Sequence, residues 1–92
     1  MITSRIADKL EGQYGVDAGL IFSLLEEAER RVFNEAAEEK VTAAVVIVAD
    51  GSADKLLDAI ELMEADWRDL LIAADLACAD WPARLNDVFG EI

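Results

Sequence analysis

Carboxylate pairs three residues apart are the feature of this sequence best suited to chemistry. Two acids at this spacing share one face of a helix, and carboxylate oxygens are ligands that Mg²⁺ favours. The pairs are Asp8/Glu11, Glu26/Glu29, Glu35/Glu38, Asp58/Glu61, Glu61/Glu64 and Asp66/Asp69. A chain with 20 acidic residues among 92 contains about four such pairs by chance. The spacing therefore predicts hydrated helix faces, and we assign no metal ligand.

Two of these pairs nevertheless resemble a known arrangement. Glu35/Glu38 followed by Glu61/Glu64 is similar in outline to the Glu-x-x-Glu and Glu-x-x-Asp pairs of the all-helical nucleotide pyrophosphohydrolases of the MazG type. The resemblance implies a magnesium-dependent hydrolase as an alternative function. The chain departs from that pattern because Glu64 stands at the position of the final aspartate, and because no lysine-rich phosphate clamp accompanies the pairs.

The absence of histidine narrows the possible chemistry further. The sequence has no histidine, which removes the commonest general base and every Ser-His or Cys-His nucleophile pair. Cys78 is the single cysteine, so it can form no internal disulfide and cannot build a thiolate zinc site. We expect Cys78 to be a small core residue. The sequence predicts a protein that is not an enzyme, with no catalytic residue, no cofactor and no metal.

A second resemblance concerns the segment Ala53-Asp54-Lys55-Leu56. It resembles the part of acyl carrier proteins that carries phosphopantetheine on the serine of an Asp-Ser-Leu motif. Lys55 stands where that serine belongs, so the resemblance implies at most a carrier-like domain without the usual attachment residue. Ser52 lies three positions away and is better explained as a helix cap.

Charge and apolar content indicate the kinds of partner. The net charge of −12 works against binding to nucleic acid or to an anionic membrane surface, and it is compatible with a basic protein partner. Apolar residues make up 54% of a chain too small to bury them all easily, so we expect a homo-oligomer, most simply a dimer. The longest apolar run, from Ala43 to Ala49, is too short to span a bilayer, and no signal-peptide pattern is present, so we expect a cytoplasmic protein.

Helical spacing of apolar residues runs through most of the chain and predicts an all-α fold. We expect one domain, residues 1–92, built as a compact bundle of five or six short helices. The predicted helix starts are Thr3 or Ser4, Asp17 (with Val16 packed on Ile21), Ser52, Asp66 and Asp80, and Asn34 could end one helix, cap the next or lie within a continuous helix. The residues expected to face the core are Ile2, Ile6, Leu10, Tyr14, Ile21, Leu24, Leu25, Ala28, Val32, Ala37, Val41, Ala44, Val45, Val48, Leu56, Leu57, Ile60, Met63, Leu70, Leu71, Ala74, Leu85, Val88 and Phe89.

The segment Val41–Ala49 allows two interpretations. Its β-branched residues would suit a buried strand, whereas its spacing continues a helical pattern. A single strand would leave its backbone hydrogen-bonding groups without partners, and no other segment predicts a strand. We therefore favour a helix.

Two tryptophans and a neighbouring arginine are the best candidates for contact with a partner. Trp67 and Trp81 are the largest side chains and stand at predicted helix starts, with Arg68 beside the first. The Asp66-Trp67-Arg68-Asp69 run and the Trp81-Pro82 tail resemble short bacterial proteins of uncharacterised function, over about half of the chain. That resemblance implies a small bacterial helical protein and no activity. The sequence as a whole predicts an acidic helical protein that acts by protein–protein contact or self-association.

Overall fold

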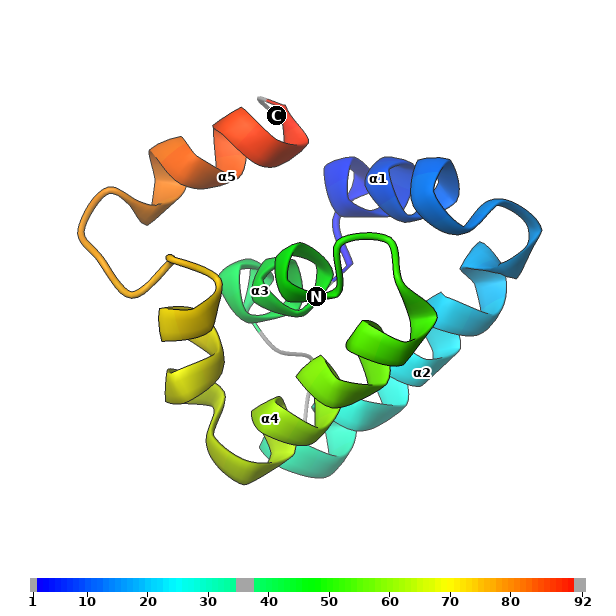
Figure 1. The fold of residues 1–92 in the computed structure, drawn as a ribbon, viewed down its shortest axis with the longest axis horizontal. Helices are drawn as coiled ribbons and strands as arrows, with labels where there is room; N and C mark the ends of the chain where they lie inside the picture. Colours follow the sequence, from blue (N-terminus) through cyan, green and yellow to red (C-terminus); the bar gives the residue numbers. More distant parts are fainter. Residues whose placement is uncertain (1, 35–37, 91–92) are drawn as a thin grey trace.

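The computed structural model describes residues 2–34 and 38–90, and within these ranges every regular element is helical. The elements are α1 (Ser4–Tyr14), the 3₁₀ turn η1 (Gly15–Asp17), α2 (Ala18–Phe33), α3 (Glu39–Ala49), α4 (Ala53–Ala73) and α5 (Trp81–Phe89) (Figure 1). The radius of gyration is 11.9 Å, close to the roughly 12 Å expected of a compact domain of this length. The prediction of a compact all-α fold is confirmed.

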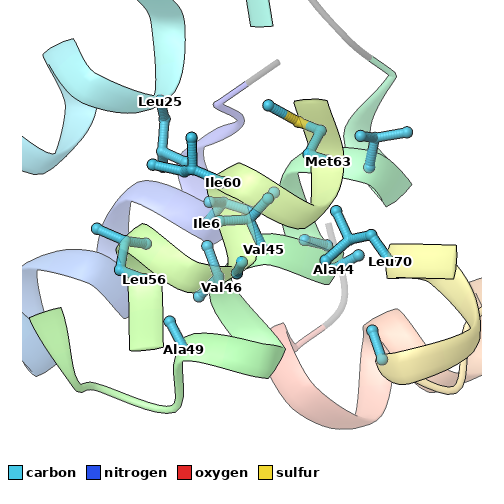
Figure 2. Close-up of a cluster of buried hydrophobic side chains, with 14 of the residues drawn as sticks. Ile6, Leu25, Ala44, Val45, Val46, Ala49, Leu56, Ile60, Met63 and Leu70 are labelled. Atoms are coloured by element: carbon cyan, nitrogen blue, oxygen red, sulfur yellow. The ribbon is translucent and has the colours of Figure 1, made fainter. Parts of the chain in front are cut away.

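Helix α3 lies at the centre of the molecule and packs against α4, α1 and α5 (Figure 1). Its residues from Val41 to Val46 are all buried, so its whole circumference is covered. A helix that is apolar on every side is normally a buried one, which explains how a β-branched segment is helical here. Figure 2 shows side chains from α1, α2, α3 and α4 meeting in this core. The helical interpretation of Val41–Ala49 is correct.

Helices α1 and α2 present the apolar stripes that the sequence predicts, but the junction between them differs from the prediction. The residues Ile6, Leu10, Ile21 and Leu25 are buried. Val16, expected to pack on Ile21, is instead fully exposed. Asp17 has helical backbone angles and makes no side-chain capping bond, because the turn η1 runs directly into α2 and leaves no extended capping residue.

Residues with left-handed backbone angles end two of the helices. Asn34, at φ 59°, ends α2 and donates its backbone N–H to the carbonyl of Arg30, which decides among the three roles left open for it. Asp50, at φ 47°, ends α3, and Gly51 follows at φ 81°. Asparagine, aspartate and glycine tolerate this conformation better than other residues, so these positions allow sharp helix ends.

Helix α4 contains a break at Asp66, where the sequence predicts a helix start. Asp66 has extended backbone angles (φ −161°, ψ 100°), and its Oδ1 accepts a hydrogen bond of 3.0 Å from the backbone N–H of Arg68. Ser52 caps the beginning of α4, since its Oγ accepts from the N–H of Lys55 at 3.3 Å. Both predicted caps are confirmed, and the break turns the second half of α4 toward α5 (Figure 1).

Removing the cap at Asp66 gives a first testable prediction. We expect Asp66→Ala to lower the free energy of unfolding by about 1 kcal/mol, because amides at the start of the second half of α4 lose their acceptor. Asp66→Asn keeps an acceptor oxygen and should cost clearly less. Urea unfolding followed by circular dichroism measures both variants, and equal losses would contradict a capping role.

The segment from the end of α4 to α5 departs from the prediction at two core positions. Val88 is 38% exposed although it was expected inside, whereas Leu85 is buried and Phe89 is half-buried. Cys78 lies half-buried in the loop before α5, with its Sγ 3.7 Å from the carbonyl oxygen of Asp75. The expectation of a core cysteine is wrong because the loop carries this residue along the surface. Pro82 stands in the first turn of α5, as predicted.

One inward assignment on α4 is also wrong. Leu56, Ile60 and Met63 are buried, but Leu57 is 51% exposed. Adjacent residues on a helix point about 100° apart, so a leucine next to a fully buried one falls at the edge of the buried stripe. Ala37, the remaining inward assignment before α3, lies outside the described residues.

Candidate functional site

Trp67 occupies the corner between α2 and α4. Its ring meets Phe33, at the end of α2, edge-on with the ring centroids 6.1 Å apart. The guanidinium of Arg68 lies 5.3 Å from the centroid of the Trp67 ring. Trp67 is half-buried and Arg68 is exposed. Packing of the indole against Phe33 thus anchors the helix after the Asp66 break, and Arg68 covers part of the ring that remains.

Trp81 lies in a different cluster, at the start of α5. The ammonium group of Lys40, from α3, is 5.2 Å from the centroid of its ring, so a cation–π contact joins α3 to α5. Arg84 forms an ion pair with Asp75 at 2.7 Å and lies 3.8 Å from Asp80. The Cys78 thiol and Arg84 lower the pKa of Asp80, and the pKa of Arg84 is raised by Cys78 and both aspartates.

The three residues proposed for partner contact therefore divide into two clusters. Trp67 and Arg68 belong to the corner of α2 and α4, and Trp81 belongs to the α3–α5 contact. Both tryptophans are half-buried and hold helices together in the structure. Their partner role stays a prediction.

A connected polar group in the described part of the chain was not foreseen from the sequence. Arg5, on α1, donates to both carboxylate oxygens of Glu39 on α3, at 2.7 and 3.0 Å. It also donates to Asn86 Oδ1 at 2.7 Å and to the carbonyl of Gly90 at 2.9 Å, while the hydroxyl of Thr3 donates to Glu39 at 2.6 Å. This Arg5 network joins α1, α3 and the end of α5 around one guanidinium.

Burial strengthens the Arg5 network. The side chains of Arg5 and Glu39 are only 10% and 19% exposed, so water screens their attraction weakly. Hydrogen bonds from Arg5, followed by the hydroxyl of Thr3, hold the pKa of Glu39 below its ordinary value, against the opposing effect of desolvation. The same contact raises the pKa of Arg5. The pair is therefore ionised over the whole neutral range.

A second unforeseen polar contact lies inside the core. Glu29 of α2 and Thr42 of α3 are both buried, with 1% and 0% of their surfaces exposed. The hydroxyl of Thr42 donates a hydrogen bond to Glu29 Oε1. A polar group in such a place is costly unless it is hydrogen-bonded, so this contact helps to fix α2 relative to α3.

Substitution of Thr42 tests the value of this contact. We expect Thr42→Val to lower the free energy of unfolding by about 1–3 kcal/mol, because it removes a donor from a buried carboxyl group without changing the volume. Thr42→Ser keeps the hydroxyl and removes only a methyl group. Chemical denaturation should rank the valine variant below the serine variant, and the reverse order would show that the hydroxyl contributes nothing.

Within residues 2–34 and 38–90, five large aliphatic side chains remain in solvent. The exposed residues are Val16, Leu20, Leu57, Ile72 and Val88, at 101%, 63%, 51%, 65% and 38%. Leu20 and Leu57 belong to α2 and α4, two helices in contact with each other. Arg31 on α2 joins Glu64 on α4 at 2.7 Å and Glu27 on its own helix at 3.1 Å.

The carboxylate pairs considered for a metal do not form a cluster in the described part of the chain. Glu61 and Glu64 are exposed on α4, and Glu64 forms an ion pair with Arg31. Glu38 is exposed before α3, and Glu35 lies outside the described residues. Within residues 2–34 and 38–90, no group of three or more carboxylate or cysteine side chains is placed to hold a metal ion.

Comparison with protein-family models, with curated proteins and with solved structures finds no match to this chain. The resemblances drawn from sequence motifs therefore stay predictions. Among the described helices, none combines the length and the apolar character needed to cross a bilayer.

Proposed function

We propose that this domain acts by binding other proteins rather than by catalysing a reaction. The observation that carries the proposal is the set of large aliphatic side chains in solvent, which a domain with a well-filled core does not need for its own folding. Three of them, Leu20, Leu57 and Ile72, keep more than half of their surface exposed on regular helices. Burial of such side chains against a partner provides a favourable free energy of association.

Self-association is the simplest form of such contact, and we expect a dimer. The mass of one chain is 10.0 kDa, so light scattering at micromolar concentration should give twice that value. Two copies each carrying a charge of −12 repel one another, and added salt should therefore strengthen a dimer. A basic partner would show the opposite dependence on salt. We expect either contact to take place in the cytoplasm, where a lone thiol such as Cys78 stays reduced.

Photo-crosslinking in the producing cells tests the proposal. A photoreactive phenylalanine analogue is placed singly at Leu57, Ile72 or Val88, and at exposed polar Asp87 as a control. We expect at least one aliphatic position to give a discrete crosslinked band, either a dimer or a second protein, that Asp87 does not give. The absence of a discrete band at all three aliphatic positions, together with a monomeric mass, would refute protein contact as the function.

A further inference from the structure

The exposed leucines of α2 and α4 lie along one seam between the two helices. The ion pair from Arg31 to Glu64 marks a point where the two helices lie beside each other. In Figure 1, α2 and the first half of α4 run in the same direction, from the right toward the lower left. Positions that precede the ion pair by equal numbers of residues are therefore at similar heights along both helices.

Helical geometry places three leucines beside that ion pair. Seven residues make about two turns, so Leu57 lies above Glu64 on the same side of α4, and Leu24 lies above Arg31 on α2. Leu20 lies four residues before Leu24, which is about one turn further from the ion pair on the same side of α2. Leu20 and Leu57 are 63% and 51% exposed, and Leu24 is half-buried. We call these three residues the α2–α4 seam.

Carboxylates border the seam on both helices. On α4, Asp54 and Glu61 stand three residues before and four residues after Leu57, which places them next to it on the helix surface. Asp17, the last residue of η1, directly precedes α2 with helical backbone angles and stands three residues before Leu20. On α2, Glu27 follows Leu24 by three residues. All four acids are exposed.

Positive charge on these two helices does not offset the acidic borders. Arg31 already contacts two carboxylates, those of Glu27 and Glu64. Lys55 is two residues from Leu57, so it projects from α4 about 160° away from it. Arg30 is six residues from Leu24, so it projects from α2 about 120° away from it. Arg68 lies over the Trp67 ring, beyond the break in α4. The seam is therefore an apolar strip with negative charge on either side.

We propose that the α2–α4 seam binds an amphipathic helix with basic borders, contributed by a different protein. This inference rests on the proposed function and names its surface and partner. A helix that carries an apolar stripe flanked by lysines or arginines matches both the leucines and the carboxylates. A second copy of this chain fits poorly, because its own acids would meet those of Asp17, Asp54 and Glu61. The backbone groups of α2 and α4 are used within the helices, so side chains alone recognise the partner.

Titration of the ¹⁵N-labelled full chain with a designed peptide tests the proposal. The probe is a peptide of about 18 leucines and lysines, five helical turns, with the leucines on one face. A peptide of the same composition, shuffled so that the leucines line no face, is the control. We expect amide shifts concentrated in α2 and the first half of α4, weaker binding at higher salt, and weaker binding by the shuffled peptide.

Paired variants separate seam binding from general attraction between opposite charges. Leu20→Ser with Leu57→Ser should weaken binding of the amphipathic peptide by about tenfold or more. Ile72→Ser with Val88→Ser also removes two exposed aliphatic residues, and it should change binding by less than about twofold. Thermal unfolding of each variant checks that it remains folded.

Three results would overturn the inference, namely equal binding of both peptides, equal effects of both double variants, or amide shifts centred outside α2 and α4. Crosslinks in cells at Ile72 or Val88 would then still support protein contact as the function. The absence of crosslinks at all three aliphatic positions, together with a monomeric mass, would instead refute the proposed function itself.

Discussion

We expect the substitution Val45→Asp to leave the chain unfolded at 25 °C. Val45 is fully buried at the centre of α3, which α1, α4 and α5 surround. Taking an unpaired carboxylate into such a place costs several kcal/mol, and the loss of valine packing adds to that cost. A domain of this size has a total stability of about 5–15 kcal/mol, so the penalty removes most or all of it. Circular dichroism and the dispersion of the amide NMR spectrum measure the result.

Aspartate substitutions at other buried positions around α3 test more sharply whether the whole helix is enclosed. Ala43, Val45 and Val46 point in different directions from the helix, and all three are at most 1% exposed. Aspartate at any of them should therefore be equally disruptive, since α3 has no face turned to water over this stretch. Ile72→Asp, on an exposed position of α4, should leave the fold intact. A folded Ala43→Asp or Val46→Asp variant would show that α3 is less completely enclosed.

The helical pattern predicted most of this architecture because it reports local geometry. Stripes such as Ile6 and Leu10, or Ile21 and Leu25, follow from the 3.6-residue period alone. The caps at Ser52 and Asp66 are also local, because each side chain bonds an amide two or three residues away. The central helix needed a further argument, since an almost wholly apolar, β-branched segment also suits a buried strand, and only the absence of a second predicted strand favoured the helix.

The surface features were harder to predict because they depend on how helices meet. Leu57 has the residue type of a core position, but it lies beside the fully buried Leu56 at the edge of the buried stripe, and which of the two faces the core depends on how α4 packs. The exposure of Val16 likewise follows from the tight turn η1, whose geometry no apolar pattern encodes. The α2–α4 seam could be recognised only once the contact of Arg31 with Glu64 showed which sides of the two helices lie together.

The Arg5 network was invisible in the sequence because its members are far apart in the chain. Arg5 and Glu39 are separated by 34 residues, and Arg5 and Asn86 by 81. Spacing rules for charged pairs operate within one helix and say nothing about such contacts. The network nevertheless joins α1 and the end of α5 to α3, since Arg5 also binds the carbonyl of Gly90.

Removal of the Arg5 guanidinium should destabilise the fold strongly. We expect Arg5→Met to lower the free energy of unfolding by about 3 kcal/mol, because it breaks a bidentate pair and leaves Glu39 poorly hydrated. Methionine keeps the apolar part of the side chain, so the loss reports mainly on the hydrogen bonds. Lysine restores the charge without the two-pronged geometry, and Arg5→Lys should recover only part of the loss. Full recovery by lysine would show that charge alone matters.

The dependence of this loss on pH follows from the lowered pKa of Glu39. Its ordinary pKa is 4.5, and the contacts with Arg5 and Thr3 lower it in the folded state. A carboxyl group whose folded pKa is depressed contributes stability that is fully present above its unfolded pKa and is lost as pH falls through its folded pKa. The difference in unfolding free energy between the natural chain and Glu39→Gln should therefore be constant above about pH 6 and shrink below about pH 4.5. The guanidinium of Arg5 stays charged throughout this range and adds no dependence of its own.

A double-mutant cycle isolates this effect from the general charge of the molecule. Lowering the pH also reduces the net charge of −12 and the repulsion that goes with it, but this change affects each variant almost equally and cancels in the differences. In an Arg5→Met background, Glu39→Gln should cost much less, and its effect should vary little between pH 3 and pH 7. Urea unfolding of the four proteins at several pH values provides the measurement. A coupling energy that does not change with pH would mean that Arg5 does not hold the ionised form of Glu39, and the three helices would then depend on the surrounding packing alone.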